Sequence, residues 1–115
     1  MKKLNTLLLV IVMFSLAACG PNKRDVLMKI HSDPLGAYAL MQVKYKGNEN
    51  SDWVFLGPTP VTLDKSINMS DAVEVSLKVI RPGFYEQTKS WKPKEFLKEH
   101  SKQNGILWVP NMVQQ

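Results

Sequence analysis

Apolar and polar residues alternate in short runs over residues 26–91, and glycines and prolines separate the runs. A period of two is typical of strands that bury one face. In the clearest run, residues 73–79, the apolar side chains at positions 73, 75, 77 and 79 face the core, and Glu74, Ser76 and Lys78 face water. The same reading predicts strands over residues 26–31, 37–45, 53–56 and 84–91, a brief pairing at 61–63 and a polar loop over 64–71.

Strands at this spacing, separated by turns, predict a mainly all-β fold, a small immunoglobulin-like β-sandwich. In the run over residues 37–45, the odd positions lie on one side of the predicted strand, and Tyr38, Leu40, Gln42 and Lys44 lie on the other.

The last quarter of the chain changes to a helical pattern. Pro93 suits the first helical position, and Phe96, Leu97 and His100 then share one face. We expect residues 92–115 to form a short helix and a final strand that pack on the same domain.

The first 18 residues read as a targeting segment. Lys2 and Lys3 precede an unbroken apolar run over residues 7–14, and small residues follow. This arrangement is typical of a secretory signal peptide. The run is too short for a permanent transmembrane helix, which needs roughly 20 apolar residues.

The sequence Leu16-Ala17-Ala18-Cys19 resembles the lipobox of bacterial lipoproteins. The resemblance implies cleavage before Cys19, a diacylglycerol thioether on its sulfur and an acyl group on its new amino terminus. The alternative is a free thiol that happens to follow a signal peptide. Because Gly20 is not aspartate, the resemblance favours an outer-membrane lipoprotein that faces the periplasm, with residues 19–25 as a lipidated tether.

Composition limits the classes further. The chain has 115 residues, which suits one domain, and its 44% apolar content with three tryptophans excludes a disordered chain. Its single cysteine leaves the domain to fold without a disulfide. Without Lys2 and Lys3 of the targeting segment, 13 lysines and arginines face 10 acidic residues, a net charge of +3. A basic face could meet acidic lipid head groups or anionic wall polymer, and the predicted compartment excludes nucleic acid.

Three turns in residues 26–91 resemble those of the PEGA domain family, a Pro-x-Gly-Ala turn, a Gly-x-Thr-Pro turn and a glycine followed by an aromatic residue. The residues that carry the resemblance are Pro34, Gly36, Ala37, Gly57, Thr59, Pro60, Gly83 and Phe84. The resemblance implies a small β-sandwich module of a bacterial surface protein without enzymatic activity. The hairpin over residues 37–52 is longer than the family's, and the tail after Trp91 lies outside its pattern.

Residues that could carry chemistry are sparse. His31 and His100 lie far apart in the chain, and no spacing typical of a metal site occurs. Ser32 follows His31 directly, and neighbours on a strand point to opposite faces. We therefore expect no enzymatic activity, no metal and no cofactor beyond the lipid on Cys19.

Aromatic and basic residues offer more for binding. We expect Trp53 and Trp108 to fill the core, whereas Trp91 lies among polar neighbours and is open to either role. Lysines dominate residues 89–102, and Asn48 lies at a polar hairpin tip. The candidate partner-binding residues are therefore Trp91, Lys89, Lys92, Lys94, Lys98 and Asn48.

Together these patterns predict a lipid-anchored, non-enzymatic interaction module of the bacterial envelope that binds a protein partner or a wall or surface polysaccharide. One alternative is an accessory subunit of a larger envelope machine without glycan contact. The other is a small hydrolase or inhibitor.

Overall fold

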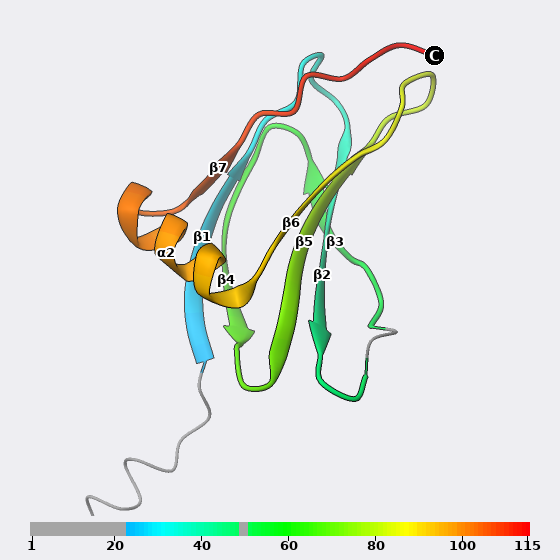
Figure 1. The fold of residues 1–115 in the computed structure, drawn as a ribbon. Helices are drawn as coiled ribbons and strands as arrows, with labels where there is room; N and C mark the ends of the chain where they lie inside the picture. The colour runs from blue at the N-terminus through cyan, green and yellow to red at the C-terminus, as the bar shows by residue number, and fades with distance from the viewer. Residues whose placement is uncertain (1–22, 49–50) are drawn as a thin grey trace, which may run out of the picture.

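The structure is a computed structural model that describes residues 23–48 and 51–115 (Figure 1). The predicted signal peptide, the residues that resemble a lipobox and Cys19 lie outside the described residues.

Two sheets face each other, and the predicted mainly β sandwich is confirmed (Figure 1). One sheet has the order β4-β1-β7 and the other β3-β2-β5-β6; β1 and β7 run parallel, and all other pairs are antiparallel. The strands are β1 (Lys23–Ile30), β2 (Tyr38–Tyr45), β3 (Val54–Pro58), β4 (Val61–Asn68), β5 (Ala72–Ile80), β6 (Gln87–Trp91) and β7 (Ile106–Trp108).

The first sheet is longer than the sequence pattern indicated. Residues 23–25 belong to β1 and not to the tether, because Lys23 pairs with Asn68 of β4. The predicted loop over residues 64–71 was wrong, since β4 continues to Asn68. Lys65 interrupts the apolar alternation of β4, but it is only half-exposed, as expected of a lysine whose aliphatic stem lies along the sheet.

The core lies between the sheets. It contains the residues on the predicted inner face of β1, three of the four inward residues predicted for β5, and Ala39, Met41 and Val43 of β2. Two assignments on β5 were wrong. Ser76 is buried because β5 lies between two strands, where its small side chain has Gln42 on one side and Ser90 on the other. The hydroxyl oxygens of Ser76 and Ser90 lie 2.7 Å apart. Val73 is exposed, since the register shifts beside it at Lys44 and Tyr45.

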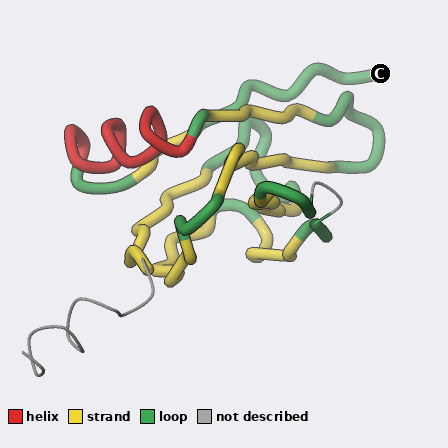
Figure 2. The backbone as a smooth tube through the Cα atoms, turned by 60° about the horizontal axis from the view of Figure 1, so that its bottom comes forward, coloured by secondary structure: helices red, strands yellow, loops and turns green. Residues whose placement is uncertain are grey.

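The chain after β7 closes one side of the sandwich. Met112 N–H donates to the Asp33 carbonyl, Tyr85 N–H donates to the Val113 carbonyl, and Phe84 forms an isolated bridge with Gln114. The strand predicted over residues 84–91 therefore starts only at Gln87, because its first residues pair with the C-terminal tail. Figure 2 shows this tail running beside the strands.

The predicted helix is α2 (Pro93–Gln103), and it begins at the expected proline. Phe96 is fully buried, and its ring meets the ring of Trp91 edge-on at 5.4 Å between centroids. Asn104, in the left-handed conformation, caps the helix, and Gly105 N–H donates to the His100 carbonyl. The helix therefore anchors its apolar side at the edge of the sandwich, between β6 and β7.

Thr59 joins two of the turns that carry the PEGA resemblance. Its buried hydroxyl oxygen accepts hydrogen bonds from Gly36 N–H and Ala37 N–H, at 3.1 and 2.9 Å. The Ser32 hydroxyl donates to the Pro34 carbonyl and also contacts the Thr59 hydroxyl, so the Thr59 proton points to Ser32. Ser32 therefore has a structural role in this turn.

The third turn also takes the predicted form. Gly36 and Gly83 both have positive φ, at 91° and 86°, which other residues rarely adopt. Phe84 is half-buried against the core, with the Arg81 guanidinium 5.1 Å from its ring centroid.

Candidate functional site

A groove runs between the first half of β1 and α2, and we call it the basic groove. It exists because β7 pairs only with Met28–Ile30, so the start of β1 extends beyond β7 and faces the helix. Its volume is about 600 Å³. Its lining residues are Lys23, Arg24, Asp25, Lys94, Leu97, Lys98, His100 and Ser101.

His100 holds the two walls of the basic groove together. The Leu27 backbone N–H donates to His100 Nε2 at 3.0 Å, across 73 positions of the chain. This bond supplies an acceptor to a β1 N–H that lies one residue before the pairing with β7 starts. The contact fixes the His100 ring in one orientation.

The electrostatics of the basic groove are one-sided. Lys23 and Arg24 lie on β1, and Lys94 and Lys98 lie one turn apart on α2, whereas Asp25 is the one acidic residue of the lining. Within the described residues, the only ion pair joins Lys44 to Glu74 on β2 and β5. The four groove cations therefore have no acidic partner in the described part of the chain.

A second surface lies on the outer face of the other sheet. It consists of Tyr38, Leu40, Trp53, Phe55 and Lys78, and we call it the aromatic face. Leu40 pairs with Phe55 on one side and Lys78 on the other, so their side chains share one face of the sheet. Tyr38 and Phe55 are 50% and 59% exposed, with ring centroids 6.1 Å apart.

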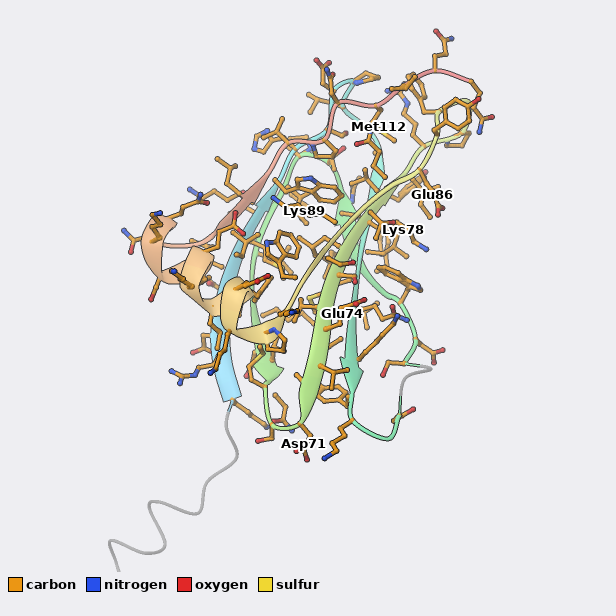
Figure 3. The ribbon with its side chains drawn as sticks, viewed as in Figure 1. Asp71, Glu74, Lys78, Glu86, Lys89 and Met112 are labelled. Atoms are coloured by element: carbon orange, nitrogen blue, oxygen red, sulfur yellow. The ribbon has the colours of Figure 1, made fainter. Side chains whose placement is uncertain are left out.

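Trp53 completes this surface and does not fill the core as predicted. It is half-buried, and Lys78 Nζ lies 4.0 Å from its ring centroid. Figure 3 labels Lys78 beside its strand, β5. Trp108 is half-buried as well, but it packs against the core, so the prediction for Trp108 was nearer to the structure.

The predicted binding residues do not form one surface. Trp91 was wrong as a contact residue, because it is 7% exposed and its Nε1 donates to Glu99 of α2. Lys89 lies 5.0 Å from the Trp91 ring centroid, on β6. Lys92 is the exposed N-cap of α2.

Of the predicted set, only Lys94 and Lys98 line the basic groove. Lys23 and Arg24 were missed because they had been assigned to the tether. Their adjacency in the sequence was the available signal, but only the fold places them beside a helix 70 positions away. On the aromatic face, the placement of Tyr38 and Leu40 on the same side of their strand was the available signal.

Asn48 is exposed at the hairpin tip, at the same end of the sandwich as the start of β1. Lys23 pairs with Asn68, the chain turns at Met69–Asp71, and Lys46 N–H donates to the Asp71 carbonyl. We call this the entry end. Figure 3 shows Asp71 at this end and Met112 at the opposite one.

Across 23–48 and 51–115, no three His, Cys, Asp or Glu side chains gather as metal ligands. None of the helices in this part of the chain is long and apolar enough to cross a membrane.

Comparisons with known proteins add no relative. No family model, no curated protein and no solved structure matches this chain. The resemblances to lipoproteins and to the PEGA family therefore stay predictions from the sequence.

Proposed function

We propose that this chain is a lipid-anchored, non-enzymatic interaction module of the bacterial cell envelope. In this proposal its sandwich faces the periplasm, and its aromatic face docks a protein partner. The lipobox supports the anchor, and the exposed aromatic face carries the docking step.

The aromatic face has the composition of a binding surface. Two rings, Tyr38 and Phe55, are each at least half exposed. Water-exposed aromatic side chains that gather on one surface favour docking, because their burial in a complex stabilises it and they are rigid. This is the observation on which the proposed function rests.

The ring geometry favours a protein over a polysaccharide. A sugar stacks on a free, flat ring face, but the Lys78 ammonium occupies one face of Trp53. The Tyr38 and Phe55 rings are inclined by 50° and do not form a common plane. In addition, β3 is an edge strand of its sheet, and extended segments of partner proteins can pair with such an edge.

A photo-crosslink in intact cells tests this function. A photo-reactive amino acid at position 55 is expected to give a discrete protein adduct, identified by mass spectrometry. The matched control is position 62, where Thr62 is exposed on β4 of the other sheet, and there we expect no adduct. Glycan adducts at position 55 would instead establish a polysaccharide ligand, and equal adducts at both positions would contradict a specific surface.

A binding measurement checks the same surface once the partner is captured. Replacing Phe55 by alanine should weaken binding of the partner at least tenfold, as is typical of a central aromatic contact. Val73→Ala removes an equally apolar exposed side chain from β5 outside this surface, and it should leave the affinity unchanged.

A further inference from the structure

We propose that the basic groove binds the anionic head groups of phospholipids in the membrane that carries the anchor. The inference rests on the lipid anchor of the proposed function, but it concerns a different surface. Its consequence is that the sandwich has a fixed orientation on the membrane.

The first support for this proposal is the position of the basic groove at the entry end. Lys23, in the groove wall, follows Cys19 by four residues. An extended chain reaches at most about 3.6 Å per residue, so the two Cα atoms lie within about 14 Å of each other. An acylated Cys19 therefore keeps the groove beside the head-group layer.

The second support is the positive charge of the basic groove. Cations from two elements converge on one cavity, with Lys23 and Arg24 on β1 and Lys94 and Lys98 on α2. Lysines four positions apart lie on the same side of a helix. Phosphate oxygens are strong acceptors for lysine and arginine, and clustered basic residues next to a membrane anchor bind anionic lipids.

The groove is also held open in a fixed shape. His100 bonds to the Leu27 N–H of β1, and Phe96 on the same helix is fully buried in the core. The cations of α2 are therefore fixed relative to those of β1. Because the groove is already ordered, it loses less conformational freedom when a head group binds.

Head groups fit this groove better than acyl chains or wall polymer. Leu97 is the one large apolar residue of its lining, so the groove offers little to a hydrocarbon chain. Wall polymers are anionic as well, but the anchor gives head groups a far higher local concentration at the entry end.

The aromatic face remains free in this orientation. It belongs to β2, β3 and β5 of one sheet, whereas the basic groove is formed by β1 of the other sheet and by α2. Membrane contact and partner docking therefore do not compete.

The test uses the purified lipidated protein in nanodiscs of phosphatidylcholine, or of equal parts phosphatidylcholine and phosphatidylglycerol. Amine labelling with mass spectrometry reports the exposure of individual lysines. With phosphatidylglycerol we expect labelling of Lys94 and Lys98 to slow at least fivefold, the effect of about one charge at an anionic surface, and high salt should reverse it. Lys89 on β6 should label equally in both discs.

Charge variants distinguish an effect of the basic groove from an effect of the protein's net charge. Lys94→Gln with Lys98→Gln should reduce the protection of Lys23 at least fivefold. The matched pair, Lys29→Gln with Lys89→Gln, removes the same charge from exposed sites outside the groove and should leave Lys23 protected.

Three outcomes overturn the inference. The first is equal labelling of Lys94 and Lys98 in both discs. The second is protection by soluble peptidoglycan fragments in phosphatidylcholine discs without any effect of phosphatidylglycerol, which would assign the groove to the wall. If mass spectrometry finds no acyl group on the protein, the lipid anchor is wrong. Flotation of the same chain with phosphatidylglycerol vesicles then tests whether the basic groove binds head groups without the anchor. Absence of binding in that flotation is the third outcome.

Discussion

At the scale of single residues, the most consequential side chains are small and polar. Thr59 links two turns through its hydroxyl, and its own N–H donates to the Ala37 carbonyl at 2.8 Å. Buried polar groups are favourable only while their hydrogen bonds are complete. Thr59 therefore connects the two turns both through its hydroxyl and through its backbone.

Thr59→Val keeps the shape of this side chain and removes that oxygen. The N–H groups of Gly36 and Ala37 and the Ser32 hydroxyl each lose a partner. We expect the free energy of unfolding to fall by about 2–3 kcal/mol in a denaturant titration. Thr62→Val makes the same change at an exposed site on β4 and should have little effect; equal stability of the two variants would show that the Thr59 bonds are not needed.

The two histidines offer a second matched pair. His100→Ala removes the acceptor of the Leu27 N–H, and we expect a loss of about 1–2 kcal/mol in stability. In the His100→Ala variant, the Leu27 amide should also exchange with solvent faster than the Ile30 amide, which serves as the reference. Hydrogen-exchange mass spectrometry or NMR measures both rates. His31 is exposed, so His31→Ala should change neither measurement, and unchanged Leu27 exchange in His100→Ala would contradict the role of that bond.

At the scale of elements, β5 organises the second sheet. It pairs with both β2 and β6, and Val75, Leu77 and Val79 are fully buried. Such a strand tolerates no charge on its inner face, because no partner is available there to compensate the lost hydration.

Two substitutions two positions apart on β5 test this description. Val75→Asp places an unpaired carboxylate in the core and should abolish cooperative thermal unfolding, leaving an unfolded chain. Val73→Asp introduces the same charge at a side chain that is 43% exposed, and its melting temperature should change by only a few degrees. Similar melting curves for both variants would mean that the faces of β5 are assigned wrongly.

At the scale of the whole molecule, the proposed functions lie on different parts of the sandwich. The entry end combines the start of β1, the basic groove and the hairpin tip, whereas the aromatic face lies on the outside of the other sheet. An anchored domain with this layout can hold a partner beside the membrane without releasing its own contact to the lipid.

The anchor is tested by one substitution. Cys19→Ser should abolish labelling by a radioactive fatty acid and leave an unprocessed precursor, because the lipobox depends on the cysteine sulfur. Fractionation of cells with gel electrophoresis measures both effects. A mature, correctly sized Cys19→Ser protein would refute the lipoprotein assignment and leave the sandwich without its proposed membrane contact.

Features that depend only on neighbouring residues could be predicted from the sequence. The period of two indicated the inner face of β1 and the two sides of β2, and Pro93 marked the start of α2, because each reflects local backbone geometry and burial of one side. The turn residues Gly36 and Gly83 were identified for the same reason, since a positive φ restricts the residue type at a single position.

Features that depend on distant segments could be read only from the folded chain. Trp91 is buried because α2 brings Phe96 and Glu99 against it, although its sequence neighbours are polar. The basic groove exists because β7 ends its pairing with β1 at Met28 and leaves the rest of that strand to α2. Burial and electrostatic potential are sums over every segment that packs nearby, and a local pattern contains only one of those segments.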